Sequence, residues 1–153
     1  MSNVFTREHI KLNLEMLEKN DYLRYIAKLS VTLGVGKEEE GVYAGLVDRE
    51  SEFITNLGDG IALPHTKSDF IIKPAIFVLK PLRDVHWGDE GGDKIKIIIC
   101  ILSPNQQDGN THMKLISSLA RKLVDENFKR VLVNTISEEE IFTMVENAIN
   151  SSL

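Results

Sequence analysis

A histidine at the end of a glycine-flanked apolar run is the first candidate for chemistry in this 153-residue sequence. The run 56–65 reads N-L-G-D-G-I-A-L-P-H and ends at His65. Gly58 and Gly60 permit positive φ and a close approach of the main chain, and residues 61–63 are typical of a short buried strand. The proline before the histidine fixes the backbone, so we expect His65 to leave the sheet edge in a defined direction. Near neutral pH a histidine can carry a proton, a metal ion or a phosphoryl group.

Two further residues have side chains suited to an anionic group. Arg49 is a permanently charged, forked donor that matches phosphate geometry. His112 is predicted in the first turn of a helix, where the N-terminus favours anions. On pattern alone, each also has a structural interpretation. A lone histidine after a strand is more often structural, an arginine at a helix end is more often solvated, and a histidine on an apolar helix face is more often half-buried and satisfied.

The remaining histidines and the single cysteine give weaker signals. We expect His9, in a polar N-terminal stretch, to have no role, and His86, beside Trp87, to serve packing or a turn, or to lie at the rim of the site. Cys100 lies within an isoleucine-rich run, where a cysteine behaves as a small buried hydrophobe. The alternative of a zinc site from His65, His86 and His112 lacks the short-range ligand spacing that is typical of such sites. The acidic run 38–40 is predicted to be the first turn of a helix.

Composition and charge exclude several classes of protein. The chain is 42% hydrophobic and 27% charged, as in globular domains, and its length suits one domain over residues 1–153. A net charge of -5 without a basic run argues against nucleic-acid binding. No apolar stretch approaches the length of a membrane span, the N-terminus lacks a signal-peptide core, and one cysteine suits a reducing compartment. We therefore expect a soluble cytoplasmic protein without direct membrane insertion.

Hydrophobic periodicity predicts strands and helices that alternate along the chain. Predicted strands cover residues 10–14 (where a helix is the competing interpretation), 61–63, 75–79 and 95–102, the last being the most apolar and therefore central. Predicted helices begin with an N-cap at Asn20 or Asp21, after Lys37, near residue 111, near residue 125, and with a capping box of Ser137 and Glu140. Residues 87–93 and 104–110 are predicted to be a turn-rich connection and a polar loop. These elements predict a three-layer α/β/α sandwich with a four- to five-stranded sheet.

The run G-D-G-I-A-L-P-H resembles the active-site signature of fructose/mannitol-type enzyme IIA domains of the bacterial phosphoenolpyruvate-dependent sugar phosphotransferase system. Asp48-Arg49-Glu50 stands where this family usually has an arginine-glutamate pair, and residues 112–120, H-M-K-L-I-S-S-L-A, resemble its second-histidine segment. The resemblance implies that His65 is the phosphorylated residue, and it also implies the mixed strand order of the sheet. It implies HPr as the phosphoryl donor, a cysteine of enzyme IIB as the acceptor, a functional link to a membrane sugar permease, and no cofactor.

One departure from the family pattern concerns the loop before the glycines. Relatives usually carry a stretch close to G-S-T-G-I, whereas this chain has F-I-T-N-L at residues 53–57. The segment 49–53 is closer to the galactitol-type branch, in which a phenylalanine follows the acidic pair. Among these residues and their neighbours, Phe53, Ile54, Leu57 and Phe70 are candidates for an apolar docking surface around His65. The resemblance also permits a second function, a regulatory module of the nitrogen-related branch whose phosphorylation state controls protein binding.

Overall fold

A computed structural model describes residues 4–52, 55–87, 94–105 and 109–150 of the chain. Its strands are β1 (Ile10–Leu14), β2 (Asn56–Gly58), β3 (Ile61–Ala62), β4 (His65–Ser68), β5 (Ala75–Pro81), β6 (Val85–His86), β7 (Lys94–Ile95) and β8 (Ile97–Pro104). Its helices are the short 3-10 helix η1 (Arg7–His9), α1 (Lys19–Thr32), α2 (Glu39–Glu52), α3 (Gly109–Lys122), α4 (Glu126–Asn134) and α5 (Glu138–Asn150).

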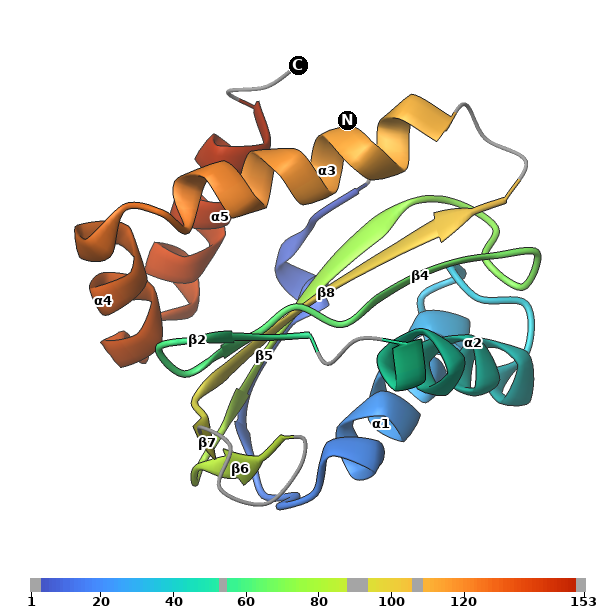
Figure 1. Cartoon of the computed structure of the whole chain (residues 1–153), viewed down its shortest axis with the longest axis horizontal. Helices are drawn as coiled ribbons and strands as arrows, with labels where there is room; N and C mark the ends of the chain where they lie inside the picture. The colour runs from blue at the N-terminus through green and yellow to red at the C-terminus, as the bar shows by residue number, and fades with distance from the viewer. Residues whose placement is uncertain (1–3, 53–54, 88–93, 106–108, 151–153) are drawn as a thin grey trace.

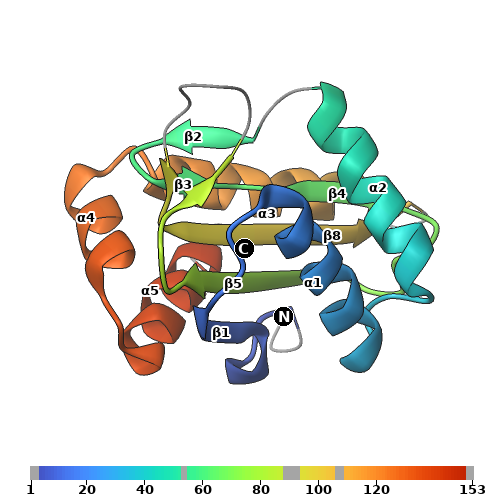
Figure 2. The ribbon, with the colours of Figure 1, turned by 90° about the horizontal axis from the view of Figure 1, so that it is seen from below.

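The elements form three layers. Helices α3, α4 and α5 cover one face of the main sheet, and α1 and α2 cover the other (Figures 1 and 2). None of the described helices is long and apolar enough to cross a lipid bilayer. The predicted three-layer α/β/α sandwich is confirmed.

The main sheet is mixed, with the strand order β1-β5-β8-β3-β2 and β4 also paired with β8. Strand β1 runs parallel to β5, β5 antiparallel to β8, and both β3 and β4 run parallel to β8. Because β3 and β4 follow one another along the same edge of β8, the six strands make a sheet that is five strands wide. The predicted strand at residues 10–14 is confirmed, and the competing helix there is wrong.

The central strand β8 shows why helices cover both faces of the sheet. Every residue of β8 is buried. Its side chains alternate, with Ile97, Ile99 and Ile101 packed in one apolar core beneath α3–α5 and Ile98, Cys100 and Leu102 in the other beneath α1 and α2. A strand buried on both faces is apolar at every position instead of alternating with polar residues. This accounts for the sequence signal that identified the central strand.

The glycine turn before His65 has the predicted backbone. Gly58 and Gly60 both have a φ of 85°, in the left-handed region that favours glycine, and Asp59 between them has a φ of 57°. The Asp59 carboxylate accepts a hydrogen bond from the Lys129 ammonium of α4 at 2.6 Å, which fastens the turn to the helical layer. Here the expectation that His65 leaves the sheet edge is wrong. His65 is the first residue of β4, which pairs with β8 again after a break at residues 63–64.

Other predicted elements agree with the structure apart from their ends. Helix α1 begins at Lys19 with Glu18 at its N-cap, so Asn20 and Asp21 lie inside its first turn, and no side-chain cap is formed. The Ser137 hydroxyl oxygen accepts the Glu140 amide hydrogen at 3.1 Å, which is one half of the predicted capping box, while the Ser137 amide donates to Thr135 Oγ1 at 3.1 Å. The predicted connection at residues 87–93 falls almost wholly outside the described residues, and the two short strands β6 and β7 on either side of it were not predicted.

His9 has a role that the sequence did not indicate. Its side chain is buried, its Nδ1–H donates to the Ile76 carbonyl at 3.0 Å, and its ring stands edge-on to Phe77 with 4.9 Å between centroids. Burial lowers the pKa of His9 below its ordinary value. The expectation that His9 has no role is therefore wrong, because it is a neutral part of the core that joins η1 to β5.

Candidate functional site

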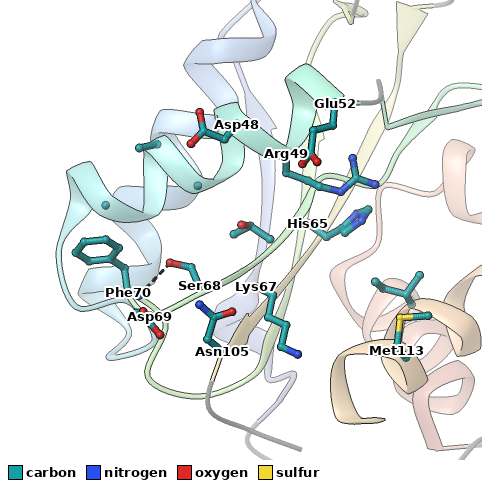
Figure 3. Close-up of a pocket in the computed structure, with 15 residues that line it drawn as sticks. Asp48, Arg49, Glu52, His65, Lys67, Ser68, Asp69, Phe70, Asn105 and Met113 are labelled. Carbon is teal, nitrogen blue, oxygen red and sulfur yellow. Dashed lines mark hydrogen bonds between the residues drawn. The ribbon is translucent and has the colours of Figure 1, made fainter. Parts of the chain in front are cut away.

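His65 lies in a cavity of about 640 Å³ between α2, β4 and the beginning of α3 (Figure 3). The lining residues come from α2 (Gly41, Ala44, Gly45, Asp48, Arg49, Glu52), from β4 and the turn after it (residues 65–70), from the residue after β8 (Asn105) and from α3 (Met113, Ile116). The cavity thus draws together segments that are more than 60 residues apart in the sequence, and it contains both cationic and anionic side chains.

The main chain fixes which nitrogen of His65 can react. Nδ1 lies 2.8 Å from the carbonyl oxygen of Leu63. A carbonyl can only accept, so Nδ1 carries the hydrogen, and in the neutral ring Nε2 then carries the lone pair. The Pro64 carbonyl accepts the Ile101 amide hydrogen at 3.1 Å, which holds this segment on β8. The histidine therefore has a defined tautomer and a defined direction.

The surroundings keep the His65 ring neutral. Burial lowers its pKa below the ordinary value, and the Arg49 guanidinium lowers it further, while the hydrogen bond to the Leu63 carbonyl and the charge of Glu50 act in the opposite direction. A neutral imidazole is the nucleophilic form, because protonation occupies the lone pair. The ring is therefore available for nucleophilic attack at neutral pH.

Close packing of α2 on β4 brings Arg49 to the histidine. A Cβ atom added at Gly45 would stand 3.2 Å from Thr66 Oγ1, so glycine lets the helix lie directly on the strand. Arg49 follows one turn after Gly45, on the same face of the helix. In Figure 3 its guanidinium group points toward the His65 ring. A permanent cation with several N–H donors at this place suits an incoming phosphoryl group.

The third predicted residue, His112, is only partly described. Its backbone lies in the first turn of α3, as predicted, and its side chain lies outside the described part of the chain. Met113 and Ile116 of the same helix line the His65 cavity. The structure thus brings Arg49 and His65 together and brings the helix that carries His112 to the same cavity.

The other candidates lie away from the cavity. His86 is an exposed residue of strand β6 and lines a separate pocket with Glu18, Lys19 and Asn20, so it does not lie at the rim of the His65 cavity. Cys100 is fully buried, and burial raises the pKa of its thiol, as expected for a small buried hydrophobe. Within the residues that the structure describes, no group of three or more His, Cys, Asp or Glu side chains is placed to hold a metal ion.

Sequence reasoning missed Lys67, which lines the cavity two residues after His65. The signal was present, since residues two apart in a strand point to the same side of a sheet. This period does not apply to a histidine that leaves the sheet, which is where the sequence predicted His65 to lie. A second cation in the cavity adds to its suitability for an anionic group.

Comparison with known proteins identifies the family. Residues 3–148 match the family described as "Phosphoenolpyruvate-dependent sugar phosphotransferase system, EIIA 2". The chain belongs to this family. The resemblance that was based on the G-D-G-I-A-L-P-H run is therefore confirmed for nearly the full length of the sequence.

Individual relatives agree with this assignment. Multiphosphoryl transfer protein 2 of Escherichia coli K12 is 31% identical over 144 residues, which cover 94% of this chain and 17% of that protein. The match spans only 12–23% of five such curated relatives, which therefore contain much more than the part that resembles this chain.

Solved structures extend the likeness to the fold. A chain of the complex of enzyme IIAMTL with phosphorylated enzyme IIBMTL from Escherichia coli superposes with a TM-score of 0.79 at 27% identity, covering 94% of this chain and 97% of that one. Nitrogen regulatory protein IIA-Ntr from Neisseria meningitidis has a TM-score of 0.82 at 21% identity, covering 94% and 97%. The family and the enzyme IIAMTL structure support a phosphocarrier role in the phosphotransferase system.

Proposed function

We propose that this chain accepts a phosphoryl group from phospho-HPr on Nε2 of His65 and passes it to a cysteine of an enzyme IIB for sugar uptake. The observation that carries the proposal is the neutral, oriented His65 ring in a cavity beside Arg49. The 153 residues act as one enzyme IIA-type domain in the cytoplasm. The likeness to a chain from a complex of enzyme IIAMTL with phosphorylated enzyme IIBMTL supports the choice of acceptor.

The chemistry is a displacement at phosphorus. The lone pair of His65 Nε2 forms the new N–P bond, the bond between phosphorus and the donor breaks, and its electron pair returns to the donor. The ring gains positive charge in this step, and the Leu63 carbonyl at Nδ1 stabilises it. Arg49 and His112 donate hydrogen bonds to the phosphoryl oxygens. Such transfer depends mainly on positioning and charge stabilisation, which these residues supply.

Transfer to a panel of purified enzyme IIB proteins tests the proposal. We expect radiolabelled phospho-HPr to label the chain, and one class of enzyme IIB then to remove the label. Labelling without transfer to any enzyme IIB, together with a protein that binds only one phosphorylation state, would favour the regulatory module. The 21% identity to a nitrogen regulatory protein supports the shared fold alone and does not favour that function. Absence of labelling by phospho-HPr would overturn both.

The docking surface gives a separate prediction. Of the four candidates, Phe53 and Ile54 lie outside the described residues, while Leu57 is 49% exposed and Phe70 is 40% exposed. Phe70 also lines the His65 cavity. Transient partners bury small interfaces that combine an apolar centre with a charged rim. We therefore expect Leu57→Asp and Phe70→Asp to slow labelling by phospho-HPr about 10-fold, because each places a charge where an apolar contact forms.

The matched control for these variants is Ile136→Asp. Ile136 is 86% exposed and lines a pocket that shares no residue with the His65 cavity. The Ile136→Asp variant should therefore be labelled at the wild-type rate. Thermal unfolding of all three variants separates a docking defect from a loss of stability. If Leu57→Asp and Phe70→Asp both react like Ile136→Asp, the partners dock elsewhere.

A further inference from the structure

A buried carboxylate lies behind the site, outside the cavity. Glu50 follows Arg49 in α2, is only 4% exposed, and is not among the residues that line the cavity. Its carboxylate accepts the Thr55 amide hydrogen at 3.1 Å and the Thr55 hydroxyl hydrogen. Lys19 Nζ lies 3.9 Å from Glu50 Oε2, at the long limit of an ion pair. Burying a charge is costly unless hydrogen bonds compensate, so this carboxylate is committed to Thr55.

From Thr55, two more hydrogen bonds lead to the reactive ring. The Thr55 carbonyl accepts the Leu63 amide hydrogen at 2.8 Å, and the Leu63 carbonyl accepts the His65 Nδ1 hydrogen, also at 2.8 Å. Thr55 and Leu63 are themselves 5% and 4% exposed. The links from Glu50 to Leu63 are therefore shielded from water, which would otherwise compete for the same donors and acceptors, and the last link reaches the half-buried His65 ring.

We propose that Glu50 is a positioning residue for His65. Its carboxylate fixes Thr55, the main chain of Thr55 fixes Leu63, and the Leu63 carbonyl holds the His65 ring with Nε2 directed to the phosphoryl group. Glu50 does not touch the phosphoryl group, so it acts only through these residues. This inference rests on the proposed function of His65 and adds the group that sets the tautomer and direction of its ring.

Two features show that this series of hydrogen bonds does more than hold α2 against the residue that precedes β2. The series ends at the nitrogen opposite the reacting one, so it controls where the hydrogen of the ring resides. The negative charge of Glu50 also raises the pKa of His65, in opposition to burial and Arg49. The same charge stabilises the positive charge that the ring gains when Nε2 bonds to phosphorus.

The test measures the His65 ring directly, before any phosphoryl donor is present. Long-range ¹H–¹⁵N NMR spectra distinguish a ring nitrogen that carries a hydrogen from one that carries a lone pair. In the wild type we expect the hydrogen on Nδ1 alone. In Glu50→Ala we expect a mixture of tautomers and a labelling rate lower by roughly 10- to 100-fold, because small misplacements of reacting groups cost this much. Thr55→Val, which removes only the hydroxyl bond, should show a smaller change in both.

Conservative variants at positions 50 and 55 should restore the tautomer of His65. A glutamine at position 50 can accept the Thr55 amide hydrogen and donate to its hydroxyl, so Glu50→Gln should keep the wild-type tautomer. Its labelling rate should lie between those of the wild type and Glu50→Ala, since the charge is lost. Thr55→Ser should match the wild type in both measurements.

Lys80→Met is the stability control. Lys80 is buried and donates to three carbonyls at the end of α4, away from the His65 cavity.

Two results would overturn the positioning role. One is a wild-type tautomer and labelling rate in Glu50→Ala. The other is an equal loss of rate in Lys80→Met at a similar loss of thermal stability, which would assign the effect to stability alone. Failure of the proposed function is distinguishable from both, because it would appear as a wild-type protein that phospho-HPr does not label, whatever the NMR spectra show.

Discussion

Replacing His65 by alanine is expected to abolish labelling by phospho-HPr and to leave the protein folded. No other group in the cavity combines a neutral nitrogen nucleophile with a fixed direction among the described residues. The ring is only half-buried and contributes little to either apolar core, so its loss should not disrupt packing. His65→Gln serves as a second variant, since its amide can donate to the Leu63 carbonyl but cannot accept a phosphoryl group as imidazole does. Labelling and circular dichroism of both variants give the result.

The matched control is His86→Ala. His86 is exposed and lies in a separate pocket, so this variant should be labelled at the wild-type rate. Persistent labelling of His65→Ala would instead show that another residue receives the phosphoryl group. Loss of labelling in His86→Ala would show that His86 also contributes to the transfer, and the assignment to His65 would then need chemical identification of the phosphorylated residue.

The fold could be predicted from the sequence where apolar periodicity is strong. The isoleucine-rich run of β8 is buried on both faces and could only be a central strand or a buried helix, and its eight-residue length favoured the strand. The ends of elements were less predictable. Helix α1 begins before its polar N-cap candidates because burial of Tyr22 and Leu23 stabilises the helix more than a local side-chain cap would. The hairpin β6–β7 has only two residues per strand, too few for a period to be read.

The candidate site, like the fold, could be predicted from the sequence only in part. A local signature located His65, because glycine, proline and histidine in sequence impose backbone requirements that few other patterns share. The interactions that orient its ring were hidden, since they join Glu50, Thr55 and Leu63 through main-chain groups that every residue possesses. Nothing in the identity of Glu50 distinguishes a buried carboxylate from an exposed one in the last turn of a helix. The role of His9 was hidden for the same reason, because its partner is the carbonyl of Ile76.

Replacing Arg49 by alanine should lower the rate of labelling by roughly 100-fold without preventing it, because one charged donor is lost while the nucleophile remains. The labelling rate of Arg49→Lys should lie between those of the wild type and Arg49→Ala, since lysine keeps the charge and loses the planar fork. Single-turnover transfer from phospho-HPr measures each rate. Arg83→Ala is the matched control, because Arg83 lines a pocket that shares no residue with the His65 cavity. The same measurement on His112→Ala tests the second proposed donor.

Replacing Arg49 changes two things at once, the pKa of His65 and the number of donors to the phosphoryl oxygens. Measuring the labelling rate at several pH values separates the two effects. Arg49 lowers the pKa of His65, so its removal raises that pKa and leaves less of the neutral ring at a given pH. This contribution to the loss should grow as the pH falls toward the ordinary pKa of histidine and disappear at about pH 8, where the ring is neutral in both proteins. The loss of the donor to the phosphoryl oxygens does not depend on the ring's protonation and should remain at about pH 8. A defect that vanishes there would show that Arg49 acts only on the ring, and wild-type rates at every pH would show that it is a solvated residue at the end of α2.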